Sequence, residues 1–271
     1  MDELLAHPAV QSAVAPFLAA LLVAAPLRRT RWLGLASVAA FAVVIGLTIG
    51  FSFESLTATR KLILAGLATA PVLLALELAG AEPGVGVRAA LAAVMAAVAV
   101  WVVWRVLQQQ EAVKAALYGV AAAAYVALLL ESSLRVGGDA IRGSATALML
   151  GLAGGGLALL GASAMLAQIG IAIAAGGGAV LLTQMVASQR APAGWTLVLP
   201  AAVTAGLVGL LAVFTGSLPW FCLIPTLAIP WATRVVSTNG RALWLTSVLS
   251  ALATLVPALI ALGLAWFAAA G

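Results

Sequence analysis

Few side chains in this sequence could perform nucleophilic, acid–base or metal chemistry. Its 271 residues include one histidine, His7, and one cysteine, Cys222. Haem, iron–sulfur and zinc sites all need more histidine or cysteine ligands than that. A Ser–His–Asp triad would depend on His7, which follows Asp2 in a polar N-terminal segment. Walker, Rossmann, nucleophile-elbow and HExxH motifs are also absent from the sequence. We therefore expect no enzyme activity, no metal and no cofactor.

Two glycine triplets are the first feature that could line a ligand site. They begin at positions 154 and 176, 22 residues apart, and their flanking residues resemble each other. Glycine lets helix backbones approach closely, and three in a row also weaken a helix, which suits an unwound segment beside a cavity. Tight packing in a chain rich in alanine and glycine is the alternative. The candidate ligand-binding glycines are Gly154, Gly155, Gly156, Gly176, Gly177 and Gly178.

The short apolar segment 218–233 is the second feature, because it contains Pro219, Pro225 and Pro230. A proline inside a helix removes one backbone hydrogen bond and leaves a carbonyl oxygen free. Short spans interrupted by proline are typical of the discontinuous helices of transporters. A bent packing helix is the alternative, with Pro219 tolerated in its first turn. Pro225 does not fit that alternative, so we include it among the candidate ligand-binding residues.

The third feature is the segment 52–61, the densest polar cluster of the chain. A threonine here could cap the helix that follows, and the two cations lie beside its positive N-terminal end. Hydroxyls, cations and free N–H groups together suit an anion such as a phosphate, a carboxylate or a lipid headgroup. In the alternative, Glu54 compensates the two cations. The candidate residues are Thr57, Thr59, Arg60 and Lys61.

Two acidic residues, Glu77 and Glu131, lie near the ends of apolar segments. An ionisable residue inside a membrane span is a candidate for function. However, both are close to an arginine, Arg88 or Arg135, so we expect ion pairs at the membrane interface. No carboxylate lies near the middle of a span, where a proton-coupled carrier usually has one.

The composition shows what must position these residues. Hydrophobic residues make up 65% of the chain and charged residues 8%, and the mean hydropathy is +1.20. Soluble proteins have about 45–50% apolar and about 25% charged residues. We therefore predict an all-α integral membrane protein, a single transmembrane domain (1–271) of about ten helices with short loops. The predicted spans are 10–26, 32–51, 62–80, 87–104, 112–130, 144–163, 166–187, 195–215, 218–233 and 242–269.

The cations predict an orientation. With the N-terminus outside, nine arginines lie on the cytoplasmic side: Arg28, Arg29, Arg31, Arg88, Arg135, Arg142, Arg190, Arg234 and Arg241. Four cations lie outside: Arg60, Lys61, Arg105 and Lys114. This bias follows the positive-inside rule, and merging spans 144–163 and 166–187 into one would change nine against four to six against seven. We therefore expect a hairpin that turns near Ser163, and both termini on the non-cytoplasmic side of a cell (inner) membrane.

Two functions fit this pattern. The first is a small secondary-transporter or permease-like protein that moves a small or weakly polar solute or a lipid-linked anion. The alternative is a non-catalytic membrane subunit or scaffold of a larger complex. In size and helix number the chain resembles drug/metabolite-type carriers, but no motif lines up with theirs. Expected partners are the lipid bilayer and other membrane subunits or a second copy of the chain. Nucleic acid is not expected, because the cations are dispersed between apolar segments.

Overall fold

The fold is known from a computed structural model, which describes residues 7–51, 54, 56–78, 84–161, 163–187, 190–192, 194–216, 218–237 and 240–270. In these residues the regular structure is helical, apart from an isolated bridge between Asp139 and Pro192. The helices are η1 (Val10–Val14), α2 (Ala15–Leu27), η2 (Arg31–Gly34), α3 (Leu35–Thr48), α4 (Ala58–Leu78), α5 (Val85–Leu107), α6 (Ala112–Leu134), α7 (Ala140–Gly161), α8 (Ala164–Val186), α9 (Leu199–Thr215), η3 (Trp220–Ala228), α10 (Ile229–Ala232), η4 (Thr233–Val235) and α11 (Leu243–Ala270).

Each predicted span overlaps one or more helices of the described residues, although several bounds differ by a few residues. Among the described residues, eight helical segments are long and apolar enough to cross a membrane. The helix α9 is shorter, and the predicted span 218–233 consists of the three short helices η3, α10 and η4. The chain is therefore a polytopic helical membrane bundle, as predicted.

The predicted hairpin within residues 144–188 is confirmed. It consists of α7 and α8, which are separated by a short turn. Ser163 has an extended backbone, and its Oγ accepts a hydrogen bond from the Met165 N–H at 3.2 Å. This side-chain cap satisfies one of the free N–H groups at the start of α8 and fixes where the second helix begins.

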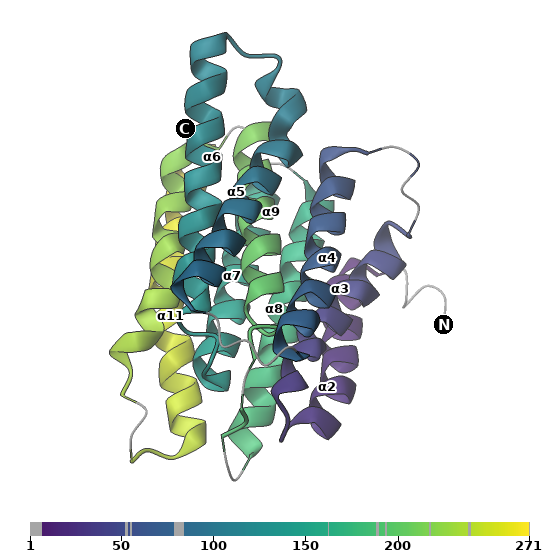
Figure 1. The fold of residues 1–271 in the computed structure, drawn as a ribbon, viewed down its shortest axis with the longest axis vertical. Helices are drawn as coiled ribbons and strands as arrows, with labels where there is room; N and C mark the ends of the chain where they lie inside the picture. The colour runs from purple at the N-terminus through teal and green to yellow at the C-terminus, as the bar shows by residue number, and fades with distance from the viewer. Residues whose placement is uncertain are drawn as a thin grey trace.

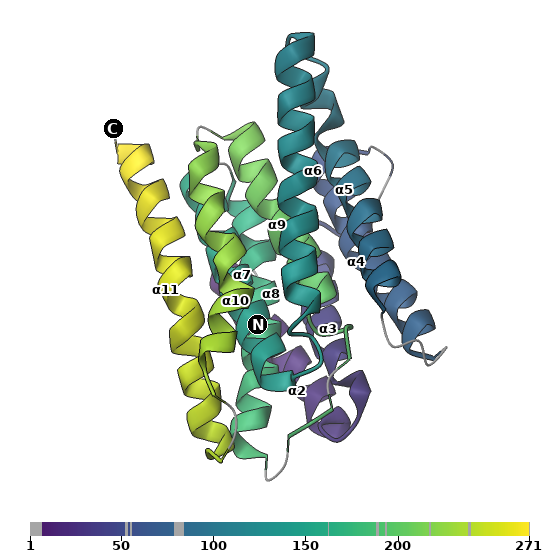
Figure 2. The ribbon, with the colours of Figure 1, turned by 60° about the vertical axis from the view of Figure 1, so that its left-hand side comes forward.

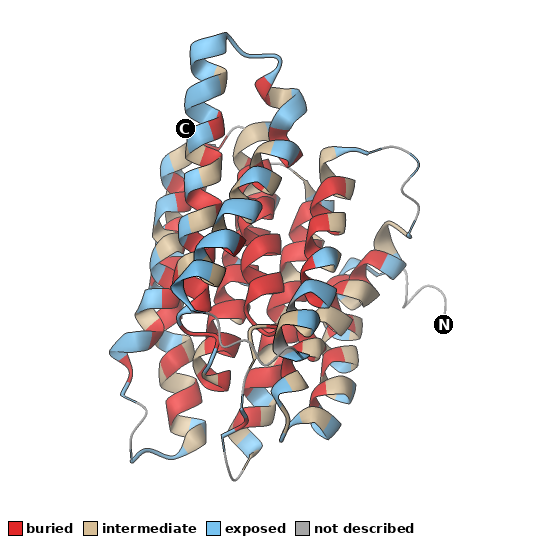
Figure 3. Ribbon diagram, viewed as in Figure 1, coloured by how far each residue is buried: buried red, intermediate tan, exposed pale blue. Residues whose placement is uncertain are grey.

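The helices α7 and α8 form the interior of the bundle (Figure 1). Their most apolar windows are 72% and 67% buried, compared with 22% for α5. Figure 2 shows α11 on one side of the bundle and α4 and α5 on the other, and in both views the α5–α6 hairpin projects beyond the remaining helices. The buried residues accordingly concentrate along the centre, while the hairpin is exposed (Figure 3).

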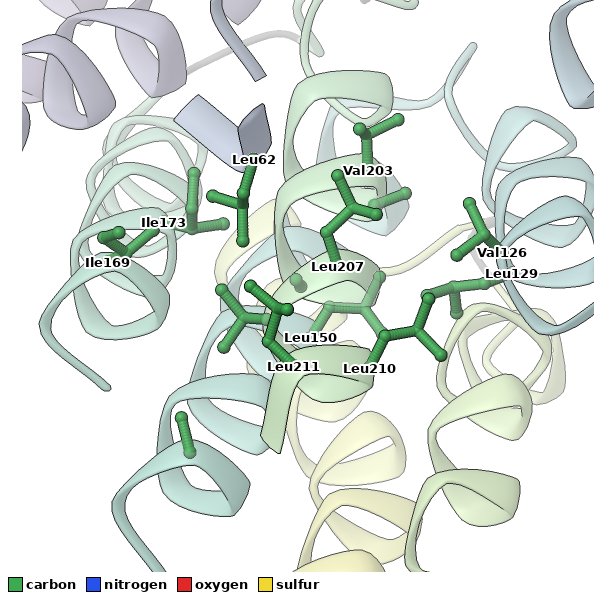
Figure 4. Close-up of a cluster of buried hydrophobic side chains, with 14 of the residues drawn as sticks. Leu62, Val126, Leu129, Leu150, Ile169, Ile173, Val203, Leu207, Leu210 and Leu211 are labelled. Carbon is green, nitrogen blue, oxygen red and sulfur yellow. The ribbon is translucent and has the colours of Figure 1, made fainter. Parts of the chain in front are cut away.

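The helix α9 is buried on all sides, from Leu199 to Ala212. It is apolar around its whole circumference, as expected for a helix that contacts protein in every direction. Figure 4 shows its side chains meeting those of α4, α6, α7 and α8. The labelled members of this cluster are Leu62, Val126, Leu129, Leu150, Ile169, Ile173, Val203, Leu207, Leu210 and Leu211.

The alternating direction of the spans separates the cations. Nine arginines, among them Arg28, Arg142 and Arg234, lie at or close to helix termini at one end of the bundle. The other four cations lie near the opposite ends of α4, α5 and α6. The charge asymmetry is therefore a property of the fold, and the side of the membrane that each end faces remains a prediction.

Candidate functional site

The start of α4 holds the polar cluster of the predicted anion site. Thr57 acts as its cap, since its Oγ1 accepts a hydrogen bond from the Arg60 N–H at 3.3 Å. The Lys61 side chain turns into the bundle and is 8% exposed. Its Nζ donates to the Trp101 carbonyl oxygen at 2.8 Å and lies 4.8 Å from the centre of the Trp101 ring. A buried ammonium needs such partners, so Lys61 joins α4 to α5. Thr59 lies half-buried in the first turn.

Of the two acidic residues predicted near span ends, the structure describes the side chain of Glu131 but not that of Glu77. Glu131 forms the predicted ion pair, with Oε1 2.9 Å from Arg135 Nη2. The side chain of Glu77 lies outside the described residues, as do residues 52, 53 and 55 of the polar segment.

Each glycine of the first triplet faces a different helix. Successive residues of an α-helix are rotated by about 100°, so three consecutive glycines open three directions. A Cβ at Gly154 would meet Ala205 of α9, a Cβ at Gly155 the backbone of α8, and a Cβ at Gly156 the side chain of Leu262 in α11. The first triplet therefore allows three neighbours to approach α7 at one depth.

The second triplet does the same for α8. A Cβ at Gly176 would contact Ser37 of α3, and one at Gly177 would lie against the backbone of α7 at Leu148. Gly178 is less crowded, since its nearest neighbours would be side-chain atoms of Leu148 and Phe17 at 3.6 and 3.9 Å.

Both triplets lie within continuous α-helices, so the unwound segment that we considered is not found. Three glycines cost a helix about 1 kcal/mol each relative to alanine. Close packing on several sides compensates this cost, because dispersion and helix–helix contact increase as backbones approach. Of the six glycines, Gly178 borders an open cleft. This cleft of about 400 Å³ is lined by apolar residues of η1, α2, α7 and α8, among them Phe17, Leu152 and Ile171.

The predicted proline-interrupted span is irregular, as expected. It has nine residues of 3-10 helix in η3, four residues of α-helix in α10 and three of 3-10 helix in η4. A 3-10 helix rises about 2.0 Å per residue and an α-helix about 1.5 Å. With ideal rises, these 16 residues would extend about 24 Å as one α-helix and about 30 Å as this mixture of helices. The tighter winding thus lets a short segment match a hydrocarbon core of about 30 Å.

Contacts at three depths attach this irregular segment to α6. At one end, the rings of Tyr118, Phe214 and Trp220 pack with centroids 5.3–6.2 Å apart. In the middle, Tyr125 Oη lies 2.9 Å from Thr226 Oγ1. Thr226 donates its own proton to the Leu223 carbonyl oxygen at 2.7 Å. The tyrosine hydroxyl is therefore the donor between the two helices.

At the arginine-rich end, the ring of Trp231 in α10 has two guanidinium groups close to it. The Cζ of Arg234 lies 4.4 Å and that of Arg135 lies 5.8 Å from the ring centre. Glu131 holds Arg135 in place through their ion pair. Cation–π contacts of this kind contribute about 0.5–2 kcal/mol, so both ends of the irregular segment are anchored to α6 or its neighbours.

Several buried hydroxyl groups lack hydrogen-bond partners among the described residues. They include the Oγ atoms of Ser247 and Ser250 in α11 and the Oγ1 of Thr146 in α7. The helix α11 packs against both α7 and η3. A buried polar atom without a partner is uncommon in proteins and often marks the place of a water molecule or a ligand. These hydroxyls are therefore polar groups in the interior of helices that contact the irregular segment.

The predicted site residues are distributed over three places. The glycines mediate packing of α7 and α8, Thr57 and Lys61 organise the start of α4, and Pro225 lies in η3. The serines and threonines of α11 were not predicted. Their spacing was a usable signal, since positions 246, 247, 250 and 254 share one face of an otherwise apolar helix.

Comparison with known proteins adds no relative to this description. No protein-family model matches the sequence, and no curated protein or solved structure is significantly similar to it.

Proposed function

We propose that this membrane protein is a permease-like carrier of weakly polar solutes, and that the irregular segment 220–235 is its moving element. The observation that carries the proposal is the nine-residue 3-10 helix η3, which contains Pro225 and lies within the predicted span 218–233. Runs of 3-10 helix longer than three or four residues are uncommon, and inside a longer helical segment they often mark a hinge.

The geometry of η3 supports a change in length. Conversion of nine residues from 3-10 to α-helix shortens a segment by about 4–5 Å. The ring of Pro225 clashes with the carbonyl four residues earlier in an α-helix, which removes part of the usual advantage of α-helical over 3-10 winding. Such a change would draw Thr226 away from Tyr125 and would also release the ring cluster at Trp220 or the cation–π contacts at Trp231, because these contacts hold the two ends at their present separation. We therefore propose that the segment is a two-state element, in which these contacts are made in only one of the two windings.

The chemistry beside the segment indicates the class of solute. Away from its arginine-rich end, the segment meets the hydroxyl of Tyr125 through Thr226, and the helix α11, which packs against η3, carries the buried hydroxyls of Ser247 and Ser250. Hydroxyls can bind neutral donors and acceptors but cannot neutralise a full charge at mid-membrane depth. We therefore expect a small neutral solute rather than an ion.

The test is solute entry into proteoliposomes that contain the full-length protein, followed by light scattering in glycerol and in urea. We expect faster entry of one of these neutral solutes than in protein-free liposomes. Pro225→Ala should slow this entry at least about tenfold, because removal of the proline ring relieves the clash with the carbonyl four residues earlier and favours a single α-helical winding. Pro219→Ala is the matched control, since Pro219 precedes the first residue of η3. Equal entry with the native protein and without protein would contradict the proposal.

A second function is favoured by a separate observation. The contacts of Gly151, Gly155 and Gly170 bring the backbones of α7 and α8 together and leave the hairpin centre solid. The α5–α6 hairpin meanwhile projects from the bundle and exposes Trp101 and Trp104. A solid core with a projecting aromatic surface suits a non-catalytic subunit that docks to another membrane protein. Mass spectrometry after purification in mild detergent tests this function, which requires a stoichiometric partner.

A further inference from the structure

The helix α8 presents one continuous stripe to its surroundings. Most of its residues are buried against α2, α3, α7 and α9, but a set spaced three or four residues apart is not. Residues with this spacing lie on a single face of a helix. The stripe consists of Gln168, Ile171, Ala175, Gly178, Leu182 and Met185.

The middle of this stripe forms one wall of the apolar cleft. Ile171, Ala175 and Gly178 face Phe17 and Leu148 across the cleft of about 400 Å³. A Cβ at Gly178 would fit at ordinary contact distance from its neighbours. The absence of a side chain at this position therefore leaves space that is part of the cleft. The cleft is therefore a space for hydrocarbon at mid-depth of the bundle.

The stripe ends at a second cavity of a different character. This cavity of about 570 Å³ at the arginine-rich end has polar and apolar walls in similar proportion. It is lined by Met185, Ala187, Arg190, Arg241, Ala242, Leu243 and Trp244. The two arginines come from the segment after α8 and the segment before α11, so the fold brings two guanidinium groups to one cavity.

Positive charge exceeds negative charge around this cavity. Arg190 Nη1 lies 3.6 Å from Asp139 Oδ2, but Asp139 also caps α7 through the N–H groups of Ile141 and Arg142. Arg241 is exposed and forms no ion pair with a described carboxylate. The first N–H groups of α11 begin at the same cavity, and their partial positive charge adds to that of the arginines.

We propose that the basic cavity and the α8 stripe together bind one anionic phospholipid. Its phosphate lies between Arg190 and Arg241, the Trp244 ring lies at headgroup level, and an acyl chain follows α8 from Met185 to the cleft. Basic cavities between membrane helices bind anionic headgroups, and tryptophan favours this depth.

The dimensions fit a lipid of one leaflet. Gly178 and Ile171 are seven and fourteen residues from Met185, which is about 10 and 21 Å along the helix. One leaflet of a 30 Å hydrocarbon core is about 15 Å thick, so the chain end reaches the cleft. A free phosphate would use the arginines but not the stripe. The site does not depend on solute transport, because a carrier and a structural subunit could both hold this lipid.

The test is native mass spectrometry of the full-length protein in detergent, titrated with phosphatidylglycerol or phosphatidylcholine of equal chain length. We expect one phosphatidylglycerol to bind more tightly than phosphatidylcholine. Arg190→Gln/Arg241→Gln should weaken its binding about 25-fold, at about fivefold per arginine. Arg28→Gln/Arg29→Gln is the control, with the same charge change at the same end of the bundle, and should bind like the native protein. Arg241→Gln alone leaves the Asp139 ion pair intact and should weaken binding about fivefold.

Two further measurements separate the lipid from a free anion. Gly178→Leu fills the cleft and should weaken phosphatidylglycerol binding, whereas Gly178→Ala should not. Inorganic phosphate at the concentration of the lipid should not displace it. Equal binding of both lipids, or full binding by Arg190→Gln/Arg241→Gln, would overturn the proposal. Displacement by phosphate together with no effect of Gly178→Leu would also overturn it and would indicate a site for a free anion.

Discussion

Tyr125 and Thr226 connect α6 to the irregular segment in the buried interior, with Tyr125 Oη 2.9 Å from Thr226 Oγ1. The two residues are 101 positions apart in the chain. Thr226 also donates to the Leu223 carbonyl oxygen one turn earlier in η3. This pair therefore links the backbone of the 3-10 helix to a neighbouring regular helix at the point where Pro225 interrupts the pattern.

Thr226→Val should destabilise the protein more than Tyr125→Phe. The valine leaves the buried tyrosine hydroxyl without an acceptor, at a cost of about 1–3 kcal/mol, whereas the phenylalanine leaves Thr226 bonded to Leu223. Thermal or detergent denaturation of the two single variants and the double variant gives the coupling free energy. Hydrogen bonds between membrane helices average about 0.6 kcal/mol in such cycles. A coupling of zero would mean that the hydroxyls do not interact.

Gly177→Ala and Gly178→Ala should have different effects on stability although the two glycines are adjacent. A Cβ at position 177 overlaps the backbone of α7, which cannot yield without moving a helix. We expect a loss of about 1–3 kcal/mol in the free energy of unfolding. A Cβ at position 178 has room and improves helix propensity, so its effect should be neutral or slightly stabilising. Similar melting temperatures for the two variants would contradict the packing described for α7 and α8.

Lys61→Gln should destabilise the protein, whereas Lys114→Gln should have little effect. Lys61 is buried and bonded to the Trp101 carbonyl oxygen, so its loss removes a charge-assisted hydrogen bond and a cation–π contact. Lys114 is 58% exposed and pairs with Glu111 at the surface, where ion pairs contribute about 0–1 kcal/mol. The measurement is the denaturation midpoint of each variant. Equal denaturation midpoints for the two variants would mean that the contacts of Lys61 with Trp101 do not stabilise the protein.

The spans and their approximate boundaries could be predicted from the sequence because apolar segments of about 20 residues have few other structures available. The break between α7 and α8 was also predictable, since charge counting required two helices and Ser163 is a good cap. The irregular segment was predictable from Pro219, Pro225 and Pro230, because a proline disturbs a helix through its own backbone and does not depend on which helices are its neighbours.

The sites were less predictable because they depend on which helices become neighbours. The triplet at 154–156 has the same sequence whether it lines a cavity or packs, and only the positions of Ala205 and Leu262 decide between these roles. Lys61 looked like a surface cation because Trp101, 40 residues away, was not known to face it. Likewise, Arg190 and Arg241 are separated by 51 positions and meet only when α8 and α11 are in place.

The reactivity of Cys222 tests the central proposal most directly. This single cysteine lies in η3 and is fully buried. If η3 changes its winding, N-ethylmaleimide should modify Cys222 in proteoliposomes at least about tenfold faster than it modifies a cysteine placed at Ala205, in the rigid contact with Gly154, in a Cys222→Ala background. Pro225→Ala should slow the modification of Cys222. Equal protection of both cysteines, with no change in Pro225→Ala, would contradict a moving segment 220–235.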